Sequence, residues 1–335
     1  MNTINLIVGD NNCGKTSVLE AIQLLKSSTS YANCISISRQ RELLALTRNS
    51  AYENFINMFS KLKKDLKISV SGKYDDKDIS YSLKGDIKKI LLDNDSLFVE
   101  EKIQDYETES FQGIAKYQFG TLVKEEKIEL NNYTKISGIM INEKNEIKIV
   151  YILPYEHLTG NIFTQIIKND AYKKICISAL QLFDPHIDDL LILKSDVGNR
   201  PIEYIKHKTL GNMPLSTYGD GIKKVLVLAN AIISANKGIL LIDEIETSIH
   251  KKYYDDIFQF IVKACKAFEV QLFATTHNLE AIDGILATQN YPNNVKDDCI
   301  SIITLKKETN RTYSRVMTGK EVFDNREAFG FEVRA

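Results

Sequence analysis

Eight residues near the amino terminus have the types and the spacing needed to hold a nucleoside triphosphate. Gly9–Thr16 fills the pattern G-x-x-x-x-G-K-[ST] at every position. Its glycines let backbone N–H groups curl around phosphates at the positive end of a helix, and Lys15 is expected to reach the β- and γ-phosphates. The Thr16 hydroxyl is expected to ligate Mg²⁺. The full set of expected nucleotide contacts here is Gly9, Asn11, Asn12, Cys13, Gly14, Lys15, Thr16 and Ser17.

Phosphate binding at such a loop requires a strand before it and a helix after it. The residues just before Gly9 form an apolar run that suits a strand buried on both faces. Those that follow recur at helical spacing: Val18, Leu19, Ala21, Ile22 and Leu25. The motif is therefore predicted to lie at a strand-to-helix turn. The alternative is a chance match in a glycine-containing turn.

A second motif supplies acidic residues. Gly238–Glu244 is an apolar strand that ends in two carboxylates, as expected of a central parallel strand whose carboxyl end faces a ligand. Asp243 fits the role of magnesium ligand, and Glu244 fits the base that activates water, since it comes one residue later. Two solvated acids at a strand end are the alternative.

A histidine follows the next apolar strand. Val270–Thr276 leads directly into His277. Alone, such a residue would more often be a structural histidine. After an acidic strand, it is interpreted as a catalytic sensor that hydrogen-bonds the γ-phosphate and the attacking water.

The spacing of these motifs predicts a large insertion and a further nucleotide contact. Asp243 comes 228 positions after Lys15, too far for a compact mononucleotide-binding core. Before the acidic strand, Leu215–Gly221 is a small-residue turn that opens a helix, so its amides could face the γ-phosphate held by a second subunit. Ordinary packing at a glycine-rich helix start is the alternative. The expected contacts in this turn are Ser216, Gly219, Asp220 and Gly221.

Taken in order, these motifs resemble the AAA15/AAA21-type ATPases, an ABC-like group that includes the ATPase half of OLD-family nucleases and the ATPases of several anti-phage systems. The resemblance is carried by Gly9–Thr16, Leu215–Gly221, Leu241–His250 and Thr275–His277. It implies an α/β fold with an ABC-type P-loop core, a mixed or mainly parallel sheet with flanking helices, ATP and Mg²⁺ as ligands, and a head-to-tail homodimer or higher oligomer.

The turn at Gly219–Gly221 departs from the Ser-Gly-Gly core of transporter-type signatures. A metal-ligating glutamine from the insertion has three candidates, Gln104, Gln112 and Gln118. Cys13 is expected to react readily with alkylating agents, because Lys15 and a helix terminus nearby would favour its thiolate.

Two domains are expected: an ATPase core formed by residues 1–30 and 205–335, and an inserted α+β lobe of helices and antiparallel strands formed by residues 31–204. Periodicity predicts helices and strands within the lobe and a final hairpin beyond it. The predicted elements are helices at Glu42–Lys64 and Ile162–Phe183, a hairpin at Leu66–Leu83, strands at Lys116–Leu130 and Ile136–Leu153, and the hairpin strands Ile300–Lys306 and Thr312–Met317.

Composition suits a cytoplasmic protein with no membrane partner. The chain has 335 residues and a net charge of −1, its five cysteines form no CxxC pair, and no stretch approaches the length of a membrane span. Nucleic acid remains a possible partner through local lysines, although solvated faces are the simpler interpretation. These lysines are Lys61, Lys63, Lys64 and Lys67, and Lys84, Lys88 and Lys89.

Three functional hypotheses follow. By resemblance, the first is an ATP-driven sensor that controls a separate effector, a nuclease, in anti-phage defence. The second is a DNA-repair or DNA-loading ATPase of the SMC-like class that itself grips DNA. The third is a scaffold that binds nucleotide without hydrolysis, which Glu244 argues against. After His277 only 58 residues remain, with Asp297-Asp298 as the sole adjacent acidic pair, so the chain is not expected to cut DNA itself.

Overall fold

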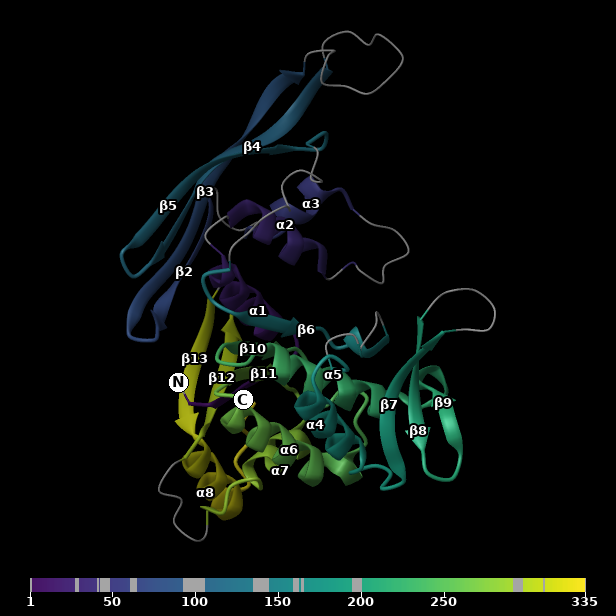
Figure 1. Cartoon of the computed structure of the whole chain (residues 1–335). Helices are drawn as coiled ribbons and strands as arrows, with labels where there is room; N and C mark the ends of the chain where they lie inside the picture. Colours follow the sequence, from purple (N-terminus) through teal and green to yellow (C-terminus); the bar gives the residue numbers. More distant parts are fainter. Residues whose placement is uncertain are drawn as a thin grey trace. The chain divides into compact units, whose positions relative to one another are not determined.

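The structure is a computed structural model that describes residues 2–27, 30–40, 42, 49–60, 65–92, 106–134, 145–158, 163, 166–194, 201–291, 298–309 and 311–334. The chain forms two compact units. The first unit contains Met1–Leu19 and Lys148–Ala335, and the second contains Glu20–Ile147. Figure 1 shows the helices and strands of both.

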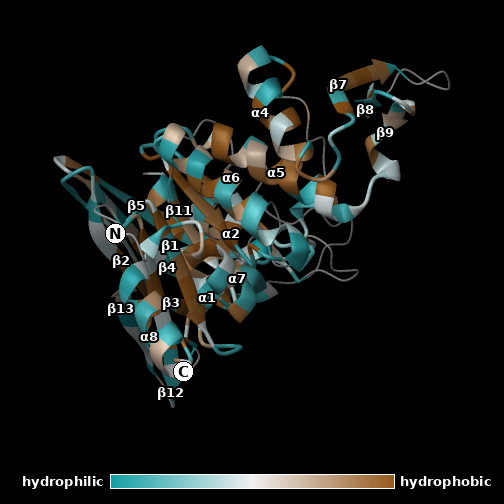
Figure 2. Cartoon of the chain, turned by 90° about the horizontal axis from the view of Figure 1, so that it is seen from below, coloured by the Kyte–Doolittle hydropathy of each residue, from teal (hydrophilic) through white to brown (hydrophobic). Residues whose placement is uncertain are grey.

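A six-stranded sheet organises the first unit, in the order β13-β12-β1-β11-β10-β6. Neighbouring strands are parallel except for the antiparallel pair β12 and β13. The strands are β1 (Ile4–Gly9), β6 (Ile149–Ile152), β10 (Ile239–Ile242), β11 (Gln271–Thr275), β12 (Ile300–Glu308) and β13 (Arg311–Thr318). β1 and β10 are buried at every position, as expected for central parallel strands covered on both faces. Figure 2 shows β1 and β11 in the brown of apolar residues.

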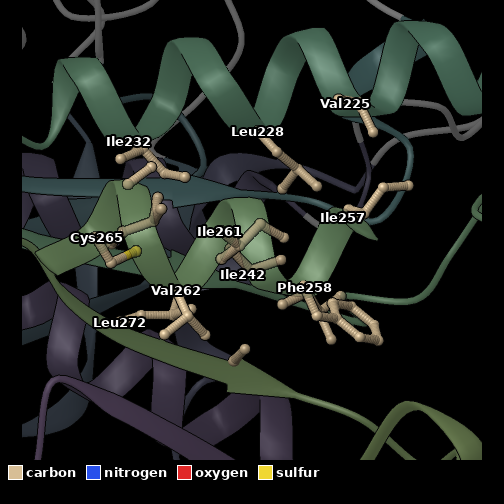
Figure 3. Packing of buried hydrophobic residues seen from close by; sticks show 14 of the residues in the cluster. Val225, Leu228, Ile232, Ile242, Ile257, Phe258, Ile261, Val262, Cys265 and Leu272 are labelled. Atoms are coloured by element: carbon tan, nitrogen blue, oxygen red, sulfur yellow. The ribbon is translucent and has the colours of Figure 1, made fainter. Parts of the chain in front are cut away.

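Helices of the first unit cover this sheet with apolar faces. Val225, Leu228 and Ile232 of α5 point toward Ile257 and Ile261 of α6 (Figure 3). The helices are α1 (Lys15–Gln23, which continues into the second unit), α4 (Asp170–Leu180), α5 (Asp220–Ser234), α6 (Tyr254–Ala267), α7 (Leu279–Leu286) and α8 (Gly319–Phe329). Short 3₁₀ turns occur at η4 (Glu156–Leu158), η5 (Leu215–Thr217) and η6 (Lys251–Tyr253). Among the described residues, no helix combines the length and the apolar composition that crossing a membrane requires.

A small antiparallel sheet also belongs to the first unit. It contains β7 (Ile187–Lys194), β8 (Pro201–His207) and β9 (Gly211–Pro214). β9 leads directly into η5 and the start of α5, so this sheet anchors the turn that carries the predicted signature.

The second unit has an antiparallel sheet in the order β2-β3-β4-β5 and its own core. Phe55, Phe59 and Phe111 form an aromatic cluster with ring centroids 5.0–5.4 Å apart. Cys34 Sγ lies 3.0 Å from the buried Tyr81 hydroxyl. The elements are η1 (Leu24–Lys26), α2 (Ser30–Gln40), α3 (Ala51–Ile56), β2 (Leu66–Tyr74), β3 (Lys77–Leu92), β4 (Tyr106–Phe119) and β5 (Leu122–Asn131).

The predicted fold class is confirmed: the protein is α/β, with a mainly parallel sheet, flanking helices and additional antiparallel sheets. Both predicted hairpins are present, as β2–β3 and β12–β13. The first turns at Asp75 and Asp76, which adopt φ of 53° and 58°. The predicted strand at Lys116–Leu130 is instead parts of β4 and β5, which join through a turn at Gly120.

The domain boundaries differ from those expected. Residues 148–204, expected in the inserted lobe, belong to the first unit, and residues 20–30, expected in the core, belong to the second. For residues 148–204 the reason lies in β6, which pairs in parallel with β10, with Ile152 opposite Ile242. Such pairing joins segments far apart in the sequence and has no local signal.

Three other predicted elements differ from the expected ranges or are described only in part. The helix expected at Glu42–Lys64 is described only as α3, and residues 41, 43–48 and 61–64 lie outside the described residues. The helix expected at Ile162–Phe183 starts at Asp170, where Asn169 caps α4. The strand expected at Ile136–Leu153 is described only as β6, and residues 135–144 lie outside the described part of the chain.

Candidate nucleotide site

The phosphate loop depends on glycine at both ends. Gly9 ends β1 with φ of 144°, and a Cβ there would collide with the carbonyl oxygen of Leu305 and with Cys13 Sγ. Gly14, with φ of 100°, needs the same conformational freedom. Asn12 also adopts a positive φ, of 63°. The tip of the loop, including Asn11 and Asn12, is exposed to solvent, as is Ser17 just beyond it.

Lys15 closes the loop on itself. Its Nζ donates hydrogen bonds to the carbonyl oxygens of Gly9, at 2.8 Å, and Asp10, at 2.9 Å. The ammonium is therefore held over the loop backbone at the start of α1. An anion in the loop would meet this charge together with the N–H groups at the helix terminus.

Cys13 lies beneath the loop. Its side chain is buried, with 2% exposure, and its carbonyl oxygen accepts a hydrogen bond from Thr312 Oγ1. The structure therefore contradicts the expectation of an unusually reactive thiol, because an alkylating agent would need access that this packing denies.

Asp243 joins the loop to the acidic strand. It follows β10, and its carboxylate accepts hydrogen bonds from Thr16 Oγ1 (3.0 and 3.3 Å) and from Thr275 Oγ1 (2.6 Å). β1, β10 and β11 are parallel, so their carboxyl ends meet at one edge of the sheet. This topology brings together Thr16 and Asp243, which are 227 positions apart.

Glu244 adopts a conformation that few residues other than glycine favour. Its φ is 51°, and its backbone nitrogen donates to Thr275 Oγ1 at 2.8 Å. Its Oε2 accepts a hydrogen bond from Thr247 Oγ1 at 3.1 Å. Thr275 and Thr247 were not among the predicted site residues. Both are hydroxyl residues beside the acidic motif and the histidine, which is the signal that could have identified them.

His277 follows β11 and meets a second acid. Its ring Nδ1 and its backbone nitrogen each lie 3.4 Å from Glu246 Oε1. Its carbonyl oxygen accepts a hydrogen bond from Arg334 Nη1 at 3.0 Å. The His277 side chain is 54% exposed, so the ring remains accessible. Glu246 lies within the acidic motif but was not among the predicted site residues.

The predicted signature turn is an open helix start. Gly219 caps α5 without a side-chain hydrogen bond, and Ser216, Gly219 and Asp220 are exposed. A Cβ on Gly221 would lie 3.1 Å from the carbonyl oxygen of Ser248, so this turn packs against the segment that follows Glu244. Unsatisfied N–H groups and the helix dipole make the start of α5 suitable for an anion.

A lysine on α5 is buried beside the acidic residues. Lys224 has 0% exposure, and its Nζ donates to the Pro154 carbonyl oxygen at 3.3 Å. Burial lowers its pKa to about 8, against the attraction of nearby carboxylates, of which Glu246 contributes most. The sequence signal for this burial is the position of Lys224 among the apolar residues of α5.

The turn after Glu244 has a further contact. Ser248 Oγ lies 3.1 Å from Nε2 of the buried His157. Burial lowers the pKa of His157, and the nearby positive charge of Lys224 lowers it further. A neutral His157 therefore packs against this turn.

The proposed metal ligands fit Mg²⁺. The Thr16 hydroxyl and the Asp243 carboxylate are hard oxygen donors that already lie within hydrogen-bond distance of each other. Mg²⁺ commonly binds through one or two protein oxygens together with substrate phosphates, which agrees with this small donor set.

Asp184, His186 and His207 also bring three possible ligand atoms within 4.8 Å of one another. His207 Nδ1 accepts hydrogen bonds from the backbone nitrogens of Thr209 and Leu210, so the ring proton is on Nε2. This Nε2 donates to Asp184 Oδ2 at 3.0 Å. Metal binding would require this proton to leave. The arrangement therefore fits a structural hydrogen-bond network.

The candidate glutamines have other hydrogen-bond partners. Gln112 donates to Glu129 and Gln118 to the Gly120 carbonyl, both within the second unit. Gln104 lies outside the described residues.

Several known proteins are similar to this chain. Residues 4–283 match the family described as "AAA domain, putative AbiEii toxin, Type IV TA system". A protein of Helicobacter pylori named ATP/GTP phosphatase is 24% identical over 363 residues, which cover 97% of this chain and 93% of that protein. An uncharacterized protein of Methanocaldococcus jannaschii is 29% identical over 117 residues, which cover 35% of this chain and 98% of that protein.

Among solved structures, the Smc head domain with an extended coiled coil, bound to the C-terminal domain of ScpA and derived from Pyrococcus furiosus, has a TM-score of 0.49 and 11% identity. The similarity covers 98% of this chain and 93% of that one. The SMC head domain from Thermotoga maritima has a TM-score of 0.39 and 12% identity, covering 94% and 89% of the two chains.

The family match spans most of the chain and includes the phosphate loop, the signature turn, the acidic strand and His277. In the structure, the phosphate loop and the acidic strand meet through Thr16 and Asp243. The chain therefore belongs to the AAA domain family that includes the AbiEii-type toxins, and it is an ATPase of the AAA/ABC-like P-loop type.

Proposed function

We propose that this ATPase holds ATP in the loop Gly9–Thr16 and cleaves its terminal phosphate at the edge of the sheet where Asp243 lies. The observation that carries this proposal is the hydrogen bond between Thr16 Oγ1 and Asp243, because it joins the phosphate loop to the acidic strand. Lys15 would leave its loop carbonyls to face the β- and γ-phosphates. The helix terminus and this ammonium would hold the phosphates.

The chemistry follows from the carboxylates and the histidine. Thr16 and Asp243 would hold Mg²⁺, which supplies charge neutralisation on the phosphates. Glu244 would take a proton from the attacking water. The water oxygen would bond to the γ-phosphorus while the bond from the γ-phosphorus to the β–γ bridging oxygen breaks. His277 would hydrogen-bond the attacking water beside the γ-phosphate. Thr247 already contacts the Glu244 carboxylate and would orient it.

Phosphate release with ATP and Mg²⁺ tests this mechanism directly. The wild-type protein should hydrolyse ATP, and Glu244→Gln should retain binding and lose turnover. The relative named ATP/GTP phosphatase makes GTP a second substrate to assay. A Glu244→Gln protein that releases phosphate at the wild-type rate would exclude this residue as the base.

We infer that ATP closes two chains head to tail, with the start of α5 of one chain facing the γ-phosphate held by the other. The support is the open helix start at Gly219, with Ser216 and Asp220 exposed beside it. Light scattering on Glu244→Gln should show a mass increase with ATP.

A Gly219→Arg change should abolish that increase, because the arginine would project from the start of α5 into the proposed interface. The fold should tolerate the change, since an added Cβ meets no atom within 4 Å inside the subunit. Gly72→Arg is the matched control, because its Cβ also has open space, on β2 of the second unit. Equal ATP-driven assembly in both variants would exclude the turn from the interface.

Control of a separate effector, a nuclease, in anti-phage defence is the biological role we propose. Its support is the family, whose description names a toxin of a type IV toxin–antitoxin system. Within the described part of the chain, the only group of three potential metal ligands is Asp184 with the two histidines, which suits a structural network better than a nuclease centre. The purified protein should leave DNA intact, and cleavage should appear only with the product of a neighbouring gene.

Robust Mg²⁺-dependent cleavage by this chain alone, lost when its own acids are mutated, would contradict the effector proposal.

The cytoplasmic location expected from the cysteine content remains a prediction.

The alternative function, direct gripping of DNA, is favoured by a row of lysines on the second unit. Lys67 pairs with Lys84, Lys84 with Ile114, and Ile114 with Lys127, so three lysines share one row across the sheet. All three are exposed, and like charges directly opposite on neighbouring strands are destabilising. Asp86 and Glu129 occupy the next row and reduce the local positive charge.

The DNA hypothesis has a direct test. If the row binds phosphates, duplex DNA should stimulate ATP hydrolysis, and salt should suppress that stimulation. Changing Lys67, Lys84 and Lys127 together to Glu should abolish it. The matched control changes three exposed lysines of the first unit to Glu, namely Lys174, Lys263 and Lys307. Turnover that is indifferent to DNA would favour the effector model.

Of the other predicted lysines, Lys89 forms an ion pair with Glu107 at 3.1 Å. Lys88 lies on the polar face of the sheet, while Lys61, Lys63 and Lys64 lie outside the described residues. These lysines therefore do not extend the in-register row.

A further inference from the structure

Two opposite charges are buried beside the proposed catalytic residues, and the mechanism so far uses neither. Lys224 of α5 has 0% exposure, and Glu246, in the turn after β10, has 7%. Burying charged groups is unfavourable unless they are paired and hydrogen-bonded. A buried pair is often no more stabilising than apolar residues of similar volume, so stability alone is a weak explanation for it.

The two carboxylate oxygens of Glu246 have different surroundings. Oε1 accepts a hydrogen bond from the backbone nitrogen of His277 and lies 3.4 Å from its ring Nδ1. Oε2 is buried and has no hydrogen-bond partner among the described residues. One oxygen therefore lies 3.4 Å from both the backbone nitrogen and the ring Nδ1 of the histidine, while the other oxygen is buried.

Lys224 supplies the compensating charge. Glu246 is the carboxylate that most favours its charged form, ahead of Glu244 and Asp243. The Lys224 ammonium is fixed by a hydrogen bond to the Pro154 carbonyl oxygen. Lys224 also comes one helical turn after Gly221, so the charge that balances Glu246 belongs to the helix that starts at the signature turn.

The contact has a consequence for the histidine ring. Because Nδ1 faces a carboxylate oxygen, the proton is expected on Nδ1, and Nε2 is the nitrogen left to face a ligand. Without such contacts, the ring would rotate about its side-chain bonds and sample other orientations. Contact at both the backbone and the ring restricts that freedom.

We propose that Glu246 is a positioning residue for His277. This inference rests on the proposed role of His277.

The first test reads the histidine ring without any need for hydrolysis. Nitrogen NMR of the five histidines, with His277 assigned by the loss of its signals in His277→Gln, reports which ring nitrogen carries the proton. Glu246→Gln should reduce the share of Nδ1-protonated His277. Glu280→Gln is the matched control, because this exposed acid of α7 is three residues from His277 and pairs with Lys251. An unchanged His277 spectrum in Glu246→Gln would overturn the proposal.

The second test asks whether Glu246 acts through His277. Glu246→Gln should lower kcat by about tenfold or more with little change in KM for ATP, as for other residues that orient a catalytic group. The variant carrying both Glu246→Gln and His277→Gln should be no slower than His277→Gln alone. If the fall in kcat of the double variant equalled the product of the two single-variant falls, the residues would act independently and the proposal would be overturned. A His277→Gln protein with wild-type turnover would refute the proposed role of the histidine, a failure visible in that variant alone.

A third variant separates positioning from charge balance. Glu246→Gln removes the carboxylate that most favours the charged form of Lys224. Lys224→Met combined with Glu246→Gln removes both buried charges. This double variant should fold, retain ATP binding and keep the altered His277 ring and the reduced kcat. Recovery of wild-type turnover would mean that Glu246 serves only to neutralise Lys224, which would overturn the proposal.

Discussion

The Thr275 hydroxyl lies 2.6 Å from Asp243 Oδ1 and also accepts the backbone N–H of Glu244 at 2.8 Å. One side chain at the end of β11 therefore orients both acids at the end of β10. This hydroxyl is fully buried, so both of its hydrogen bonds are shielded from water.

Thr275→Val should retain the shape of the side chain and remove both hydrogen bonds. We expect turnover to fall by about 10–100-fold, as when other groups that orient metal ligands are lost. Stability should decrease by about 1–3 kcal/mol, because buried polar groups lose their partner. Phosphate release and urea unfolding measure the two effects. Thr304→Val is the control, since Thr304 is buried in the same sheet but donates to the Val333 carbonyl. Equal kinetics in the two variants would contradict a role for Thr275.

Lys15→Ala should weaken ATP binding by about 100-fold, because charge-assisted hydrogen bonds to the phosphates are lost. Among the described residues, this ammonium bonds to two carbonyl oxygens of its own loop and to no other group, so its removal should change stability little. Isothermal titration measures the affinity, and thermal unfolding checks the fold. Unchanged affinity would exclude Lys15 as a phosphate ligand.

Glu244→Gln should lower turnover by about 10²–10⁴-fold while ATP affinity stays close to that of the wild type, since a general base acts in the transition state. Thr247→Val should give a smaller loss, because it removes only the hydrogen bond to Glu244 Oε2. A larger defect in Thr247→Val than in Glu244→Gln would require another role for the threonine.

Lys224 should make stability depend on pH. Its pKa is lowered to about 8 in the folded protein from an ordinary value of 10.5, so between these values the unfolded chain binds more protons. Unfolding free energy should therefore rise with pH across this window, by about 3 kcal/mol in total, relative to Lys224→Met. Urea unfolding of both proteins at several pH values between about 7.5 and 9.5, where the rise begins, measures the difference in their unfolding free energies. Parallel pH profiles would show that the lysine does not titrate in this range.

All five cysteines should be unreactive in the folded protein, because each of them is buried. Burial also raises the pKa of the Cys176 and Cys265 thiols to about 12, which disfavours their reactive thiolates. A thiol reagent should therefore react slowly under native conditions and label all five cysteines in denaturant. Fast labelling of Cys13, protected by ATP, would mean that the phosphate loop opens in solution.

The local parts of this protein could be predicted from short segments of its sequence. Gly9 and Gly14 needed no tertiary information, because the conformations they adopt and the chemistry of Lys15 are properties of a short segment. The buried strands β1 and β10 and the final hairpin were likewise predicted from runs of apolar residues. The roles assigned to Glu244, His277 and the signature turn remain predictions.

The tertiary structure decided which distant residues meet. β6 joins the core sheet by pairing with β10, so residues 148–204 left the lobe to which they had been assigned. Packing also buries Lys224, although lysines are ordinarily exposed. The Thr275 hydroxyl acquired its partners only through the register of β10 and β11. Strand order, register and burial depend on contacts across the whole chain, whereas a local motif depends only on the residues beside it.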